Sequence, residues 1–205
     1  MTLYLSGDEA ADRLLTEDPF ALLVGMVLDQ QIPLERAFAA PAQLRERLGG
    51  TLRAAEIAAM APDKLVAVFA AKPALHRFPA SMAGRVQQLA AVIAEQFGGD
   101  ASRVWAGATS GAELLRTVRS LPGFGEQKAR IFIALLGKQL GIRPDGWERA
   151  AGNFGTAGTF ASIADIDGPE ALQRVRTHKA QMKIAAKSAA GLGTAGRPTR
   201  RPSPR

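Results

Sequence analysis

Apolar residues recur every three or four positions along almost the whole chain, and this helical spacing restricts the possible folds more than any other feature. Val86, Leu89 and Ile93 form one such stripe within 82–97, and two glycines follow it, as is typical of a helix end. Strand-like alternation of β-branched residues is hard to find. Further helices are expected to begin at Asp18-Pro19, to run from Pro33 toward Leu48 with a restart at Pro41, and to cover 62–69, 112–120, 126–140 and 169–192. The sequence therefore predicts an all-α fold.

The net charge of +7 is concentrated at one end of the sequence. Residues 1–170 contain 17 Lys and Arg against 19 Asp and Glu, whereas residues 171–205 contain nine Lys and Arg and no acid. Residues 193–205 carry almost no apolar side chain, so we expect a disordered basic tail after a single domain at 1–192. Basic residues within 171–192 suit either a solvated helix face or a nonspecific contact with nucleic acid; they are Arg174, Arg176, Lys179, Lys183 and Lys187.

The composition excludes several kinds of site. The chain has no cysteine, which excludes disulfides, cysteine nucleophiles and a cysteine-held iron–sulfur cluster. Its two histidines are too few for a typical histidine-built metal site. No uninterrupted stretch of 18 apolar residues is present, and acidic residues precede the first long apolar run, so neither a transmembrane helix nor a signal peptide is expected. We therefore expect a cytoplasmic protein with no metal, no cofactor and no membrane contact.

The sharpest local motif is Leu121-Pro122-Gly123-Phe124-Gly125, which separates two predicted helices. Two glycines around one apolar residue permit a tight turn with positive φ angles. Such a hairpin presents the unpaired backbone N–H groups of the next helix, with its positive dipole end, to an anion such as phosphate. Cations in the flanking helices would add to this site, namely Arg116, Arg119, Lys128 and Arg130. A plain turn between two helices explains the same residues equally well.

Three segments together resemble the helix-hairpin-helix (HhH-GPD) superfamily of DNA glycosylases, which includes endonuclease III and the adenine and alkyladenine glycosylases. Leu121-Pro122-Gly123-Phe124-Gly125, flanked by Val118 and Ala129, is similar to the superfamily's DNA-binding hairpin. Leu28-Asp29-Gln30-Gln31 resembles its Leu-Ser-Gln-Gln stretch, and His76-Arg77-Phe78 resembles its basic entry into the helix before the hairpin. The resemblance covers residues from about 18 to 150, roughly two-thirds of the chain.

The resemblance implies a two-lobed helical architecture with the hairpin beside the cleft between the lobes. One lobe would span approximately 20–133, and the other would combine 1–19 with 134–192. Many members carry a four-cysteine iron–sulfur loop, which this chain lacks. The resemblance further implies a nucleoid-associated monomer whose partner is damaged double-stranded DNA.

The resemblance also implies a catalytic carboxylate. Members with lyase activity carry a lysine at the position of Gln127, and a catalytic aspartate 18 residues later, where this chain has Asp145, with Glu148 as the reserve. A carboxylate there would stabilise the positive charge that develops on the sugar as the base leaves. Gln127 cannot form a Schiff base, which indicates a monofunctional glycosylase, unless Lys128 reaches the sugar rather than a phosphate. Asp145 and Glu148 also have the spacing of a helix capping box.

Gln30 and Gln31 are the candidates for filling the gap that a flipped base leaves, and Gln31 is the better match, although both also suit an exposed helix end. Trp147 is the candidate for stacking on that base, although core packing is the more usual role of a tryptophan. The resemblance thus implies a cluster-free, monofunctional DNA glycosylase of base excision repair. Two alternatives remain: a helix-hairpin-helix protein that binds distorted DNA without catalysis, and an RNA- or ribosome-associated basic protein suggested by the tail alone.

Overall fold

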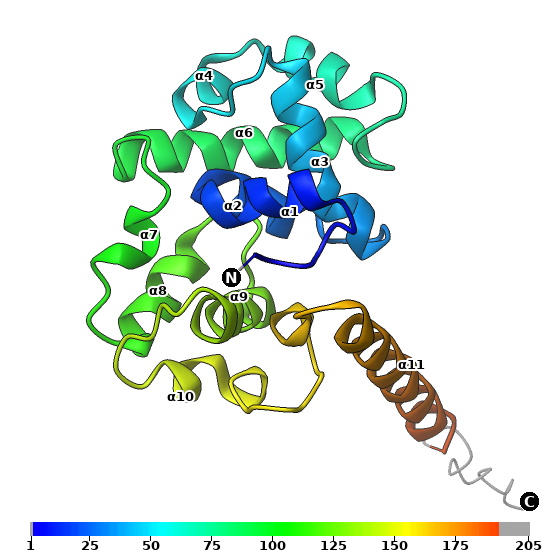
Figure 1. Ribbon diagram of the computed structural model, residues 1–205. Helices are drawn as coiled ribbons and strands as arrows, with labels where there is room; N and C mark the ends of the chain where they lie inside the picture. The colour runs from blue at the N-terminus through cyan, green and yellow to red at the C-terminus, as the bar shows by residue number, and fades with distance from the viewer. Residues whose placement is uncertain (1, 193–205) are drawn as a thin grey trace, which may run out of the picture.

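The structure of the protein is a computed structural model that describes residues 2–192, with residues 179 and 186–192 given by their backbone alone. Throughout this part of the chain the regular elements are helices, so the all-α prediction is confirmed (Figure 1). None of the described helices is both long and apolar enough to span a membrane. The predicted tail at 193–205 lies outside the described residues.

The α-helices are α1 (Glu9–Glu17), α2 (Pro19–Leu28), α3 (Leu34–Arg47), α4 (Ala54–Ala59), α5 (Pro62–Ala70), α6 (Pro79–Gln96), α7 (Arg103–Ala106), α8 (Gly111–Ser120), α9 (Glu126–Gln139), α10 (Trp147–Ala151) and α11 (Pro169–Leu192). Two short 3-10 helices, η1 (Gly152–Phe154) and η2 (Ile163–Asp165), lie between α10 and α11.

The helices form two groups, one above the other in Figure 1. In the first group α6 packs against α2, α4 and α5, while α3 packs against α1 and α2. In the second group α9 is central and contacts α8, α10, η1 and η2. This grouping differs from the predicted lobes at 20–133 and at 1–19 with 134–192. Helix α1 lies with α2 and α3, and α9 lies with α10 and η2, because their apolar faces meet there.

Local sequence sets most of the helix ends. The Asp18 carboxylate accepts hydrogen bonds from the N–H groups of Phe20 and Ala21 at 2.9 and 3.1 Å, and Pro19 takes the first helical position, so α2 begins where predicted. The predicted restart at Pro41 is wrong, because α3 continues through it. The proline ring is buried, and its apolar contacts offset the lost backbone hydrogen bond.

Helix α2 lies at the centre of the molecule, between α6 and α9 in Figure 1. Every residue from Phe20 to Leu28 is buried. Gly25 permits a close approach to α3, because a Cβ at this position would lie 2.8 Å from the Phe38 ring. A helix that is apolar on all sides belongs in the core. The end of α2 is therefore held firmly, and so is the start of the loop that follows Leu28.

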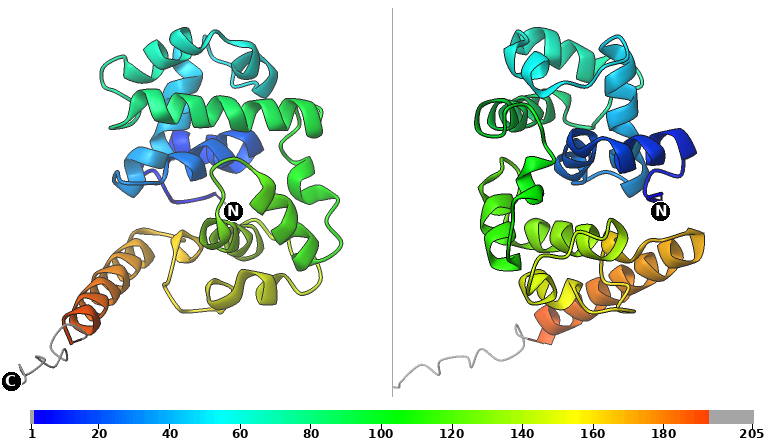
Figure 2. Two further views of the ribbon diagram at one scale, coloured as in Figure 1. Left: turned by 180° about the vertical axis from the view of Figure 1, so that it is seen from behind. Right: turned by 60° about the vertical axis from the view of Figure 1, so that its left-hand side comes forward.

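Helix α11 begins against the second group and then runs outward from the body (Figure 2). Ala171 and Val175 are buried near its start, whereas Met182 and Ile184 are 59% and 66% exposed. Among the basic residues predicted to form a nucleic-acid contact, Arg174 lies over the Phe160 ring and Arg176 pairs with Glu35 of α3. Lys183 is exposed, and the side chains of Lys179 and Lys187 lie outside the described part.

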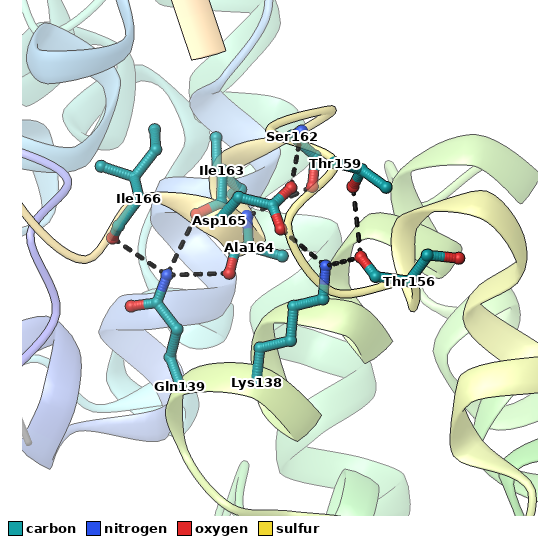
Figure 3. A network of polar contacts seen from close by, with 9 residues as sticks. All are labelled: Lys138, Gln139, Thr156, Thr159, Ser162, Ile163, Ala164, Asp165 and Ile166. Carbon is teal, nitrogen blue, oxygen red and sulfur yellow. Dashed lines mark hydrogen bonds and ion pairs between the residues drawn. The ribbon is translucent and has the colours of Figure 1, made fainter. Parts of the chain in front are cut away.

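A network of polar contacts ties the irregular segment before α11 to α9 (Figure 3). Lys138 Nζ donates to the Thr156 carbonyl at 2.7 Å and lies 2.6 Å from an Asp165 carboxylate oxygen. The Lys138 and Asp165 side chains are only 14% and 5% exposed. The Gln139 amide donates to three backbone carbonyls within 163–166. Side chains of α9 thus hold a segment that has little regular structure of its own.

Replacing Lys138 with methionine is expected to destabilise the protein by about 3–5 kcal/mol, because the Asp165 carboxylate would stay buried without its partner. Urea denaturation followed by circular dichroism measures the loss. The matched control is Arg53→Met, which removes a 70% exposed side chain from an ion pair with Glu56 and should cost less than about 1 kcal/mol. Equal losses in the two variants would contradict a special contribution from the buried pair.

Candidate nucleic-acid interface

Residues 121–125 form a tight turn between α8 and α9. Leu121 ends α8, the Phe124 N–H donates to the Leu121 carbonyl at 3.1 Å, and Gly125 is the N-cap residue of α9. Leu121 and Phe124 are buried, and the Phe124 ring meets Phe132 edge-on with centroids 5.6 Å apart. Pro122 is half-buried, while both glycines and the first residues of α9 are exposed. The N-terminal end of α9 is therefore open to an anion from solvent.

Gly123 attaches the turn to the end of α2. Its φ is +86°, and a Cβ at this position would lie 3.2 Å from Val27 Cγ2. Glycine is favoured both by the left-handed backbone and by the close contact. Because Val27 belongs to the last turn of α2, this contact joins the two groups of helices. The hairpin is thus in direct contact with the buried C-terminal end of α2.

Lys128 makes a second link between the hairpin and α2. Its amine donates to the Met26 carbonyl, one of the last four carbonyls of α2, which have no partner within the helix. Burial lowers the pKa of Lys128, the Asp29 carboxylate opposes this shift, and Arg85 adds to it. The amine therefore caps α2 instead of pointing outward for the phosphate or sugar contact that the sequence suggested.

The structure separates Gln30 from Gln31. The Gln30 side chain is used within the protein, because its Nε2 donates to the Val27 carbonyl and its Oε1 accepts from Arg85 at 2.8 Å. Gln31 is exposed and has a φ of +58°, which is uncommon for a residue other than glycine. The loop that follows α2 therefore leaves one glutamine, Gln31, exposed at the surface.

Arg77 and Phe78 lie next to this loop, although no sequence motif indicated that they could contact a ligand. The His76 Nε2 atom lies 2.9 Å from the Gln30 carbonyl oxygen, which brings the 76–78 segment to the loop. Phe78 is 41% exposed, and the Arg77 guanidinium lies 4.8 Å from the centre of its ring. An exposed aromatic ring beside an arginine is a typical platform for stacking on nucleic-acid bases.

Gln127 and Asp145 line different clefts. Gln127 faces a cleft of about 810 Å³ between α9, η1 and α11, where His178 is also found. Asp145 lines a smaller cleft of about 310 Å³ beside the start of α8. Arg130 borders both clefts. The two residues to which the resemblance assigns the catalytic positions therefore line separate clefts, and Arg130 borders both of them.

The capping box expected from Asp145 and Glu148 is absent. The N-cap residue of α10 is Gly146, whose φ of +68° starts the helix one residue later than the sequence suggested. The Asp145 carbonyl accepts from the Gly111 N–H at 2.7 Å, and the Asp145 and Glu148 side chains are both exposed. The Asp145 carboxylate is thus held near α8 by its backbone and is not used as a cap.

Trp147 is part of the packing around α9. A Cβ at Gly137 would lie 2.3 Å from the Trp147 ring, so the indole occupies the space above this glycine. The Arg143 guanidinium lies 6.0 Å from the ring. Trp147 and Glu148 line a third cleft, which neither Asp145 nor Gln127 borders. Core packing therefore describes Trp147 better than stacking on a flipped base.

Two of the cations predicted at the hairpin share one carboxylate. Glu126 lies 2.8 Å from Arg119 and 2.7 Å from Arg130, and all three side chains are at least one-third exposed. Arg116 is exposed on α8. Exposed ion pairs are weak, so a phosphate can compete for these arginines. Among residues 2–192, no group of three His, Asp or Glu side chains is arranged to hold a metal ion.

The chain matches no protein-family model, no curated protein and no solved structure. The functional interpretation therefore depends on the residues themselves and on their geometry.

Gly123→Ala is expected to destabilise the protein by roughly 1–2 kcal/mol, because alanine disfavours a positive φ and its Cβ would press on Val27. Gly125→Ala is the matched control: φ is −74°, a Cβ would meet nothing within 4 Å, and the change should stay within about 0.5 kcal/mol. Urea denaturation of both variants tests the contact. A loss in Gly125→Ala as large as in Gly123→Ala would show that attachment to α2 does not explain the requirement for glycine.

Proposed function

We propose that the protein is a DNA glycosylase of base excision repair, which binds damaged duplex DNA through the hairpin and hydrolyses the N-glycosidic bond of a flipped base. The observation that carries the proposal is a set of contacts that connects three exposed features: the N-terminal end of α9, Gln31 and the Arg77–Phe78 pair. The hairpin before α9 contacts the end of α2, and His76 joins the loop that follows α2 to the Arg77–Phe78 segment. These three features suit a phosphate, the gap left by a flipped base, and the face of a base, respectively.

In this proposal the hairpin binds the phosphates of the DNA backbone. Backbone N–H groups and a helix dipole bind phosphate without reading sequence, which suits a repair enzyme that must scan any sequence. Residues 1–170 have more acidic than basic side chains, so a generally basic body does not provide this attraction. The contact is instead local to the hairpin, with Arg116, Arg119 and Arg130 nearby and the basic C-terminal segment as a separate source of charge.

The chemistry is assigned to Asp145. In the proposed reaction the bond between C1′ and the base nitrogen breaks, and the base leaves with the bonding electrons and takes a proton from solvent. A water oxygen bonds to C1′ and loses a proton to the carboxylate. The exposure of Asp145 in a cleft that Arg130 also borders supports access by an extrahelical nucleotide. Gln127 has no amine, and the Lys128 amine is bonded to Met26, so both observations favour hydrolysis by water over a lyase reaction.

A second candidate is a protein that binds distorted DNA through the same surface without excising a base. The observation in its favour is that Asp145 and Gln127 line separate clefts. An exposed carboxylate in a cleft apart from the other predicted catalytic residue lacks the preorganised surroundings that accelerate a reaction.

The experiment that tests the proposal is a panel of duplexes, each with one damaged or mispaired base, incubated with the protein and then treated with alkali to cut abasic sites. We expect cleavage of at least one lesion, without cleavage when alkali is omitted. Asp145→Asn should lower the rate by about 10²–10⁴ while leaving DNA affinity unchanged, on the scale of one positioned carboxylate.

The matched control for Asp145→Asn is Asp167→Asn, which removes an exposed carboxylate from a different cleft and should excise at the wild-type rate. Excision by Asp145→Asn at the wild-type rate would remove Asp145 from the mechanism. Tight binding to distorted duplexes with no excision of any lesion would favour the second candidate.

Gln31→Ala is expected to lower the preference for damaged over intact duplex by roughly tenfold, the scale of one lost hydrogen-bonding contact. Affinity for intact duplex should change less than twofold, because the hairpin remains. Fluorescence anisotropy with intact and lesion-bearing duplexes measures both quantities. The control is Gln88→Ala, an exposed glutamine on α6, and an equal effect of this substitution would contradict a specific role for Gln31.

A further inference from the structure

His76 is fully buried, and both of its ring nitrogens are used. The Nε2 atom lies 2.9 Å from the Gln30 carbonyl oxygen, and Nδ1 accepts a hydrogen bond from the Phe78 N–H at 3.0 Å. Because Nδ1 accepts, it carries no proton, so Nε2 carries the proton and donates it to Gln30. A single neutral tautomer thus joins the 29–31 loop to the 76–78 segment.

The bond to Gln30 acts directly on the backbone of Gln31. The Gln30 carbonyl belongs to the peptide group that precedes Gln31, and the φ angle of Gln31 is the rotation away from this plane. With a φ of +58°, Gln31 holds a conformation that persists only where surrounding contacts impose it. The Gln30 side chain is fixed by Val27 and Arg85, but the carbonyl itself is fixed by His76.

We propose that His76 is a positioning residue, which holds the peptide group between Gln30 and Gln31 and thereby sets the direction in which the Gln31 side chain leaves the surface toward DNA. This inference rests on the proposed function, because that function gives Gln31 its role in the duplex. The same ring fixes Phe78 through its N–H, so His76 sets the spacing between the two surface side chains.

The surroundings of His76 favour its neutral form. Burial lowers its pKa from the ordinary value of 6.5; the positive charges of Arg36 in α3 and of Arg77 act in the same direction, and the carbonyls of Gln30 and Leu28 oppose them. Protonation would place an N–H against the Phe78 N–H and remove that hydrogen bond.

Two further charged groups lie at the 29–31 loop. Arg85 of α6 reaches the loop through Gln30 Oε1, and Asp29 within the loop acts on Lys128 of α9. Because these contacts lower the pKa of His76, a His76 released from them binds a proton more readily as the pH falls below 6.5, and acid favours loss of the contacts. Above this pH we expect the 29–31 loop to stay bonded to His76.

The experiment compares His76→Leu, which can make neither hydrogen bond, with His76→Gln, which offers one donor and one acceptor. His178→Leu is the matched control, because it removes the other histidine of the chain from a separate cleft. The first readout is hydrogen exchange of the Phe78 amide in the free protein. The second is the fluorescence of 2-aminopurine placed beside a lesion in a duplex, which rises when the base loses its stacking.

In His76→Leu we expect the Phe78 amide to exchange roughly tenfold faster than in the wild type. The increase in 2-aminopurine fluorescence on binding should be smaller by a similar factor, and the affinity for intact duplex should stay within twofold of the wild-type value. His76→Gln should restore both signals, and His178→Leu should leave them unchanged. Between pH 7.5 and 5.5 the wild-type fluorescence rise should diminish, while that of His76→Gln should stay constant. If His76→Leu does not fold, as judged by circular dichroism, the pH comparison between the wild type and His76→Gln tests the role of His76.

Two outcomes would overturn the role of His76 but leave the proposed function standing. In the first, His76→Leu unstacks the base as much as the wild type does; in the second, His76→Gln shows the same pH dependence as the wild type. A wild-type protein that neither binds nor unstacks any duplex would overturn the proposed function, and with it this role. Unchanged exchange of the Phe78 amide in His76→Leu would overturn the proposal whatever the DNA measurements show.

Discussion

The hydrogen bonds that cap the C-terminal end of α2 are the contacts on which the candidate DNA-binding surface depends. Met26 accepts from the Lys128 amine, Val27 accepts from the Gln30 amide, and the Val27 side chain supports Gly123 of the hairpin. Because α2 itself is buried along its length, these groups are held at fixed positions in the core. Elements from both groups of helices are thereby brought together, and Lys128 meets Met26 although the two residues are 102 positions apart in the sequence.

Features that depend on neighbouring residues could be predicted from the sequence. The start of α2 follows from the Asp18 side chain and the fixed φ of Pro19, and the bounds of α11 follow from Pro169 and the periodic residues after it. Features that depend on tertiary contacts could not. Pro41 remains inside α3 because its ring is buried, and α1 lies against α3 because both have apolar faces that must be covered.

In the candidate site, too, only the features that depend on neighbouring residues could be predicted. The hairpin was predictable, because a glycine at Gly123 and two flanking helices are local properties. The different roles of Gln30 and Gln31 were not, since they arise from Arg85 and His76, which are far away in sequence. The direction of Lys128 likewise depends on where α2 ends. Residue type indicates which side chains can bind DNA, but the fold decides which of them are already engaged.

The ion-pair arrangement at the hairpin affects how DNA binding would respond to salt. Arg119, Glu126 and Arg130 together carry one net positive charge, so they count electrostatically as a single cation. The steepness of salt dependence reports the net phosphate charge neutralised, and a carboxylate that stays in place cancels part of it. In the proposed complex with DNA, the hairpin would therefore offer two arginine side chains to the phosphates but the net attraction of a single charge, which would favour rapid release over tight attachment at any one position.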